Sequence, residues 1–268
     1  MFPEKTRGTL ETALKKGGEV IMDHQGTALE TTRKEKISSV VTKADLAAEK
    51  AILEILGNTS FPCNIISEES GFMDRGASRT WVVDPLDGTS NFAAGLPWFG
   101  VIIALFHEDQ PVLGGMHLPL EKAYYMAEMG KGATLNGTPL RISEASNLEE
   151  ILVAYSFDFS DTPGKTRSEM QVMERLSERV RNIRSTNSLV DFCYTARGWL
   201  GGAVNQTTKI WDIAAPWLLI REAGGVVTDI TGKDLRFDLS VGSLDRNYTI
   251  VAACPGVHRE LIKLIQPT

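Results

Sequence analysis

The spacing of apolar residues predicts two amphipathic helices in the first quarter of the chain. Apolar or small side chains recur at helical spacing from Leu10 to Ile21 and again from Leu46 to Leu56. Thr42-Lys43-Ala44-Asp45 precedes the second helix with the spacing of a capping box, with aspartate in the place that glutamate usually takes. Between the helices, residues 27–41 are polar and β-favouring, which predicts a hairpin with a mobile tip.

Short apolar runs then predict a series of strands. Residues 101–106 contain no polar side chain, which is typical of a strand that is buried on both faces. Further strands are expected at 62–66, 111–117 and 122–128, and Asn136-Gly137 indicates a tight hairpin turn. Consecutive strands with such short connections favour a mostly antiparallel sheet.

After about residue 145, the pattern changes and helices alternate with strands. Strands are expected at 151–157, 203–204, 226–228 and 248–253, and helices at 169–180, 188–196, 211–223 and 255–265. The expected fold class combines α+β and α/β: an N-terminal, mostly antiparallel half (1–145) and a C-terminal α/β half (146–268) that share one cleft.

The composition of the chain argues against several classes of function. The chain has 268 residues, of which 43% are hydrophobic and 23% charged, and a formal net charge of -6, which argues against general nucleic-acid binding. The 3 cysteines form no CxxC pair, so we expect no disulfide framework and a cytoplasmic location. Charged residues interrupt the first 26 positions and no apolar run approaches the length of a membrane span, so we expect neither a signal peptide nor a membrane association.

Residues 81–92, Trp-Val-Val-Asp-Pro-Leu-Asp-Gly-Thr-Ser-Asn-Phe, carry the strongest chemical signal. The pattern predicts a strand that delivers Asp84 and Asp87 to its carboxyl end, a turn stiffened by Pro85, and a helix N-terminus with free N–H groups. Carboxylates beside an anion-binding helix end indicate a site where hard cations bridge the acids to a phosphate.

This stretch resembles the central motif of the inositol monophosphatase family, whose members are Mg2+-dependent, lithium-sensitive phosphomonoesterases. Two further pieces resemble the same family in the same order: Ser-Glu-Glu-Ser at 67–70, and Trp-Asp-Ile-Ala-Ala-Pro at 211–216 with Glu-Ala-Gly-Gly at 222–225. The likeness extends from about Leu10 to the end of the chain. It implies a layered α-β-α-β-α sugar-phosphatase fold, a homodimer, and a small phosphorylated metabolite as substrate.

The resemblance also implies the ligands of two or three Mg2+ ions. They come from three segments of the chain: Glu68, Asp84, the Leu86 carbonyl, Asp87 and Asp212. The first three would hold one ion, the three aspartates would hold the second, and Glu68 would contact a weaker third ion through water. Glu69 would support the ligands without binding an ion. Four converging carboxylates repel one another, so bound cations fit this set.

The resemblance also implies that Asp45 and Thr89 activate the attacking water. Asp45 would accept a hydrogen bond from Thr89, and the pair would polarise the attacking water. Without the resemblance, Asp45 is explained as an acid that starts a helix. The Gly88 and Thr89 N–H groups are expected to bind the phosphate oxygens.

The substrate wall departs from the pattern of inositol-specific members. In those members, a glutamate seven positions before the Trp-Asp aspartate contacts inositol hydroxyls, whereas this chain has Asn205. Asn187 and Leu189 are larger than the residues common in the family's substrate-facing segment. We expect Asp87, Asn187 and Asn205 to contact the substrate. Inositol monophosphate is the leading candidate, and fructose 1,6-bisphosphate, 3'-phosphoadenosine 5'-phosphate and histidinol phosphate are alternatives.

The sequence gives less support to other kinds of catalytic site. The acids are spaced Asp-x-x-Asp rather than Asp-x-Asp, which disfavours a haloacid-dehalogenase-type phosphatase, and the 4 histidines lack the close spacing of a zinc site. Some members of the resembled family also bind the transcription machinery. We keep that role as an alternative of another class, but the acidic balance leads us to expect neither a nucleic-acid nor a transcription partner.

Overall fold

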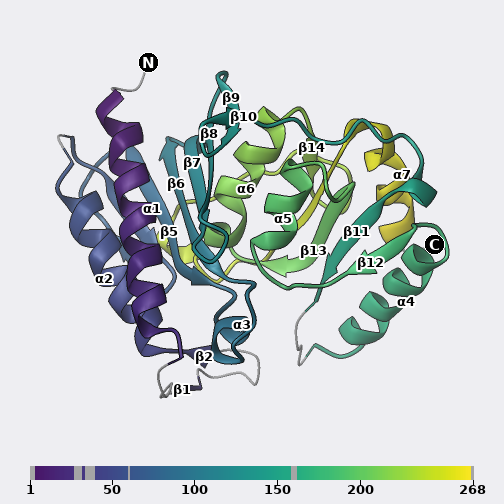
Figure 1. Ribbon diagram of the computed structural model, residues 1–268, viewed down its shortest axis with the longest axis horizontal. Helices are drawn as coiled ribbons and strands as arrows, with labels where there is room; N and C mark the ends of the chain where they lie inside the picture. The colour runs from purple at the N-terminus through teal and green to yellow at the C-terminus, as the bar shows by residue number, and fades with distance from the viewer. Residues whose placement is uncertain (1–3, 27–31, 34–39, 60, 158–161, 267–268) are drawn as a thin grey trace.

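A computed structural model describes residues 4–26, 32–33, 40–59, 61–157 and 162–266. It has five layers, as expected (Figure 1). Helices α1 (Glu4–His24) and α2 (Lys43–Gly57) cover the outer face of the first sheet. Helices α5 (Val190–Ala196) and α6 (Ile210–Glu222) lie between the two sheets, and α4 (Lys165–Ser177) and α7 (Pro255–Ile265) lie outside the second.

The first sheet is mostly antiparallel, as predicted, and has eight strands in the order β10-β9-β8-β7-β6-β5-β3-β4. Only β3 and β5 pair in parallel. The strands are β3 (Asn64–Ser67), β4 (Gly71–Met73), β5 (Arg79–Asp87), β6 (Gly100–His107), β7 (Gln110–Leu118), β8 (Ala123–Glu128), β9 (Gly132–Leu135) and β10 (Thr138–Pro139). Asn136 and Gly137 both have positive φ and form the predicted turn between β9 and β10.

The second sheet is mixed and has the order β12-β11-β13-β15-β14. Strand β11 pairs in parallel with β12 and β13, while β15 pairs antiparallel with β13 and β14. The strands are β11 (Leu152–Ser156), β12 (Asn182–Arg184), β13 (Gly202–Thr208), β14 (Val226–Thr228) and β15 (Tyr248–Ala253). The predicted division after residue 145 falls between β10 and β11, and it remains a prediction.

Strand β6 shows why the first sheet needs helices on both faces. Ile102, Ala104 and Phe106 pack into the core that faces α6, whereas alternate residues such as Val101 and Ile103 pack toward α1 and α2. An unbroken apolar run is therefore buried on both sides, as the sequence predicted.

The expected hairpin at 27–41 falls largely outside the described residues. The two described pieces, β1 (Thr32–Arg33) and β2 (Val40–Val41), pair antiparallel, in agreement with a hairpin.

The prediction of a turn at Pro85 was wrong. Pro85 lies inside β5, where Pro85 and Leu86 together stand opposite one residue of β6, because Asp84 pairs with Ile102 and Asp87 with Gly100. Proline has no N–H to donate, and a bulge is one of the few places in a sheet where none is required. The following short helix, α3 (Thr89–Ala93), begins after Gly88.

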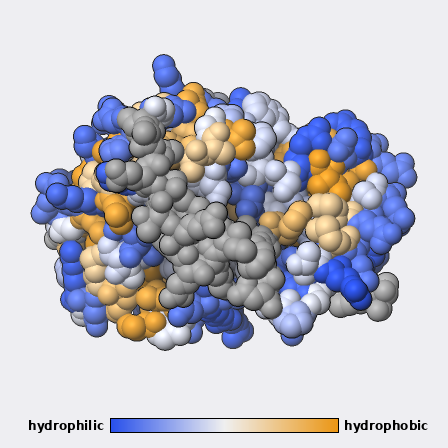
Figure 2. All heavy atoms as spheres, turned by 90° about the horizontal axis from the view of Figure 1, so that it is seen from below, coloured by the Kyte–Doolittle hydropathy of each residue, from blue (hydrophilic) through white to orange (hydrophobic). Residues whose placement is uncertain are grey.

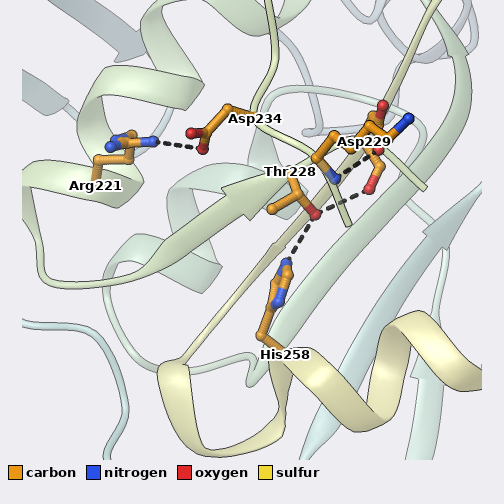
Figure 3. A network of polar contacts seen from close by, with 6 residues as sticks. Arg221, Thr228, Asp229, Asp234 and His258 are labelled. Atoms are coloured by element: carbon orange, nitrogen blue, oxygen red, sulfur yellow. Dashed lines mark hydrogen bonds and ion pairs between the residues drawn. The ribbon is translucent and has the colours of Figure 1, made fainter. Parts of the chain in front are cut away.

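Side-chain contacts connect helices α6 and α7 to the end of β14 and the turn that follows it (Figure 3). The Thr228 hydroxyl at the end of β14 lies 3.0 Å from Nε2 of His258 on α7 and donates to the Asp229 carbonyl at 2.9 Å. Arg221 at the end of α6 lies 3.4 Å from the Asp234 carboxylate. These contacts fix the surface turn after β14 against both helices.

The visible surface is mainly hydrophilic. Seen from below, its apolar residues form separate patches divided by hydrophilic ones, in the part that grey atoms do not cover (Figure 2). None of the helices in the described part of the chain combines the length and apolar character needed to cross a membrane.

Candidate metal and active site

The bulge in β5 places two carboxylates at the edge of a cleft. Asp84 stands at the start of the bulge and is 1% exposed, and its Oδ1 accepts a hydrogen bond from the Leu86 N–H at 3.0 Å. Asp87 ends the strand, and its Oδ2 accepts a hydrogen bond from the Leu189 N–H of the C-terminal half. The one extra residue of the bulge allows both acids to reach the same cleft.

Asp212 joins these acids from the opposite half of the chain. It is the third residue of α6, and its Oδ2 accepts hydrogen bonds from the Lys209 N–H and the Thr208 hydroxyl, each at 2.7 Å. One oxygen from each of Asp84, Asp87 and Asp212 can be chosen so that all three lie within 4.8 Å of one another. Three of the four predicted carboxylate ligands are therefore brought together.

Glu68 lines the same cleft without belonging to that group of three. It follows β3, and its N–H donates to the Val83 carbonyl of the parallel strand β5 at 3.1 Å. The carboxyl ends of parallel neighbours meet at one edge of the sheet, which brings Glu68 beside Asp84. Glu69 is partly buried and does not line the cleft, so its supporting role remains a prediction.

Burial and mutual repulsion dominate the electrostatics of the cluster. Burial raises the pKa of Asp84 well above its ordinary value, and the charges of Glu68, Asp87 and Asp212 raise it further. The pKa of Asp87 is also raised well above normal, first by burial and then by Asp212, while the Leu189 N–H opposes this shift. The cluster therefore disfavours full ionisation unless a cation is bound.

Asp45 and Thr89, the predicted water-activating pair, lie in contact. The Thr89 hydroxyl lies 3.0 Å from Asp45 Oδ1 and 2.9 Å from the Leu86 carbonyl, and its one proton can serve either oxygen. Asp45 Oδ2 accepts from the Thr42 N–H at 2.8 Å and the Thr42 hydroxyl at 2.6 Å, which completes the predicted capping box. Burial raises the pKa of Asp45, against the effect of these hydrogen bonds.

Gly88 occupies a position that only glycine fits. Its φ is 83°, and a Cβ at this position would lie 2.4 Å from the Trp98 carbonyl oxygen. Gly88 and Thr89 both line the cleft, where their N–H groups are predicted to bind phosphate.

Apart from the acids of the cluster, the lining of the cleft is mostly polar and, except for Asp191, uncharged. The cleft measures about 260 Å³, and Asn187 and Asn205 line it, as predicted. The Oδ1 atom of Asn205 accepts a hydrogen bond from the Thr207 N–H at 2.8 Å, and its amide NH2 can donate to a ligand.

Among the cleft residues that sequence reasoning missed are Ser156, Ser188 and Asp191. Asp191 is 3% exposed on α5 and is held by hydroxyls of Ser156 and Thr186, which lie far apart in the chain. A charged residue within the apolar run Leu-Val-Asp-Phe-Cys was the one available signal.

The cluster fits a hard divalent cation. All its donor atoms are carboxylate oxygens, which Mg2+ and similar ions prefer, and the raised pKa values of Asp84 and Asp87 mark a site that a positive charge would relieve. No thiol or imidazole lines the described part of the cleft, so a softer metal fits less well.

The model of the inositol monophosphatase family matches residues 3–266. The chain belongs to the inositol monophosphatase family. This membership agrees with the layered fold and with the acidic cluster at the bulge of β5, and it supports a metal-dependent phosphatase as the general function.

Relatives within the family carry different names. A protein of Pasteurella multocida named Nus factor SuhB is 34% identical over 259 residues, which is 95% of this chain and 93% of that protein. A fructose-1,6-bisphosphatase/inositol-1-monophosphatase of Thermotoga maritima is 32% identical over 253 residues, 94% of this chain and 92% of that protein. The crystal structure of the extragenic suppressor protein suhB from Bartonella henselae has a TM-score of 0.88 at 28% identity, covering 98% and 99% of the two chains.

Proposed function

We propose that this protein is a Mg2+-dependent phosphomonoesterase of small polyol phosphates, with inositol monophosphate as its leading substrate. The observation that carries the proposal is the meeting of Asp84, Asp87 and Asp212 oxygens within 4.8 Å, in a cleft that Thr89 also lines. Glu68, Asp84, the Leu86 carbonyl, Asp87 and Asp212 would hold two or three Mg2+ ions. Bound Mg2+ would supply Lewis acidity and a water of lowered pKa.

The protein's own groups would position the nucleophile and the phosphate. With its proton donated to Asp45, the Thr89 hydroxyl offers its lone pairs to the attacking water and orients it. Asp45 supports this arrangement as a carboxylate, because Thr42 already supplies two donors to its other oxygen. The Gly88 and Thr89 N–H groups would face the phosphate oxygens.

The charges of the cleft favour a neutral leaving group over a second phosphate. No Lys, Arg or His lines the cleft within the described residues. Two basic residues that could be considered as ligands of a second phosphate instead bind main-chain carbonyls. Lys209 donates through Nζ to the Asp245 carbonyl at 2.6 Å, and Arg184 donates to the Ile183 carbonyl at 2.8 Å. Fructose 1,6-bisphosphate and 3'-phosphoadenosine 5'-phosphate are therefore weaker candidates than inositol monophosphate, and histidinol phosphate stays open.

The test is phosphate release from a panel of these four compounds with and without Mg2+. We expect Mg2+-dependent release from inositol 1-phosphate, and loss of at least about 10²-fold in kcat/KM for Asp87→Asn, because that variant removes a predicted ligand and a substrate contact. Release from a bisphosphate alone would refute the assignment of a neutral leaving group. Absence of any Mg2+-dependent release would refute the proposed activity.

A second candidate function follows from the relatives named Nus factor SuhB. A protein of this family could bind the transcription machinery in addition to, or instead of, acting as a phosphatase. Pull-down with RNA polymerase, compared between wild type and the Asp84→Asn variant, separates the roles. Binding that survives the loss of activity would establish the partner role, and absence of binding would reject it. For either candidate function, it remains a prediction that the protein forms a homodimer, is cytoplasmic and is sensitive to lithium.

A further inference from the structure

The segment Thr186–Leu189 connects the C-terminal half to the predicted metal ligands. It lies between β12 and α5, and its Leu189 N–H donates to the carboxylate of Asp87. Its Asn187 lines the cleft and has a φ of 52°, in the left-handed region that non-glycine residues seldom adopt. Such a conformation persists only where surrounding contacts hold it.

One of these contacts comes from the N-terminal half. The Nδ2 group of Asn91 on α3 donates to the Thr186 carbonyl at 2.8 Å and to the Trp98 carbonyl at 2.9 Å. Asn91 therefore fixes one end of the segment to the loop that follows α3.

The other contact comes from Asp191, the second residue of α5. Its Oδ1 accepts from the Thr186 hydroxyl at 2.9 Å, and its Oδ2 accepts from the Ser156 hydroxyl at 2.7 Å. Burial raises the pKa of Asp191, and the two hydroxyls, together with the backbone N–H groups of Thr186 and Asn187, oppose this shift. Asp191 is 3% exposed, so this carboxylate is buried among donors that belong to the segment and to β11.

We propose that Asp191 is a positioning residue that braces segment 186–189, so that the Leu189 N–H orients the Asp87 carboxylate for cation binding. Asp191 lines the cleft, but each of its oxygens accepts a hydroxyl from the segment or from β11, and the proposed role is carried by these contacts. The catalytic consequence rests on the proposed phosphatase function, whereas the consequence for cation binding does not.

The experiment compares Mg2+ binding, measured calorimetrically with Mg2+ alone, between wild type and Asp191→Asn. The variant keeps the shape of the side chain but exchanges an acceptor for a donor that faces hydroxyl groups. We expect Mg2+ binding about tenfold weaker, the lower end of the range for residues that orient metal ligands. Unchanged affinity in the folded variant would overturn the proposal.

Glu169→Gln is the matched control. Glu169 is also buried, at 2% exposure, but it lies on α4 beside Lys165 and does not line the cleft. If the role of Asp191 were only structural, both variants would lower the unfolding temperature and neither would change Mg2+ affinity. We expect the change in affinity in Asp191→Asn alone.

Two milder variants keep the proposal testable if Asp191→Asn does not fold. Thr186→Val and Ser156→Ala each remove one hydroxyl donor from Asp191, and we expect each to weaken Mg2+ binding about threefold. Wild-type affinity in both would overturn the proposal. If the wild-type protein binds Mg2+ but hydrolyses nothing in the panel, the proposed function fails while the positioning role is still decided by these titrations.

Discussion

At the scale of single residues, the way each side chain divides its hydrogen bonds determines what it can offer a ligand. Asn205 uses Oδ1 to accept the Thr207 N–H, which leaves donors for the cleft. A glutamate, as in inositol-specific relatives, would present an acceptor instead. The cleft is thus suited to a substrate that places an acceptor oxygen, such as a hydroxyl or ring oxygen, against Asn205.

Asn205→Asp should therefore lower kcat/KM for inositol 1-phosphate about tenfold, because it replaces a donor by an anion and loses about one hydrogen bond of 1–2 kcal/mol. Steady-state kinetics at saturating Mg2+ provides the measurement. Asn205→Ala, which offers neither donor nor charge, separates the lost donor from the added repulsion. Equal kcat/KM for Asn205→Asp and wild type would show that the amide does not donate to the substrate.

The acids of the cluster were predictable from sequence because each lies in a short motif of neighbouring residues. Asp191 was not, because its partners Ser156 and Thr186 come from other segments. Their proximity depends on the parallel pairing of β11 with its neighbours, which a single sequence does not reveal.

At the scale of secondary-structure elements, Asp45 and Asp212 are held in the same way at the start of a helix. Asp45 and Asp212 are each the third residue of a helix, and each accepts the N–H of the residue that precedes its helix. The helix start thereby fixes the carboxylate before any ligand arrives. Between them, the bulge of β5 and Gly88 turn the chain from strand to α3 within the cleft.

Gly88→Ala should destabilise the fold by at least about 2 kcal/mol, because alanine at positive φ costs about 1–2 kcal/mol and the new Cβ would also meet the Trp98 carbonyl. Urea unfolding measures the loss. Gly95→Ala is the control, since Gly95 has a φ of 76° but nothing within 4 Å of the added Cβ. Equal losses in the two variants would mean that the contact with Trp98 relaxes without cost.

Strands with strong apolar runs were predicted, whereas the short strands β4 and β12 were not. Gly71–Met73 is only partly buried and Asn182–Arg184 is mostly exposed, and pairing with β3 and β11 defines these strands more than their own sequence does. The turn at Pro85 was wrongly predicted for a related reason: a bulge exists only relative to a neighbouring strand.

At the scale of the whole molecule, the site depends on both halves. Helix α6 packs against both sheets and carries Asp212 at its start, while Asp84 and Asp87 belong to the first sheet. The buried cluster consequently affects the stability of the complete fold.

Stability should fall with rising pH when Mg2+ is removed by a chelator. Asp84 and Asp87 have folded-state pKa values raised well above their ordinary 3.8, so above about pH 4 the folded state binds more protons than the unfolded state. The stabilising effect of their protonation is present at low pH and is lost as pH rises through the raised pKa values. Mg2+ should replace the protons, so it should raise the unfolding temperature more at about pH 8 than at about pH 5.

Thermal unfolding across this range, in chelator and in Mg2+, provides the measurement. Asp84→Asn should weaken the pH dependence in chelator, because it removes one of the two raised carboxyls. A profile in chelator that is the same for wild type and Asp84→Asn would contradict this origin.

The position of Asp212 at the start of α6 also affects how the protein chain unfolds. An ion held by Asp84 and Asp212 would close a long chain loop between β5 and α6, much as a covalent cross-link does, but reversibly. Amide exchange of α6 and β5 should then slow together on addition of Mg2+, because opening either element would require release of the ion.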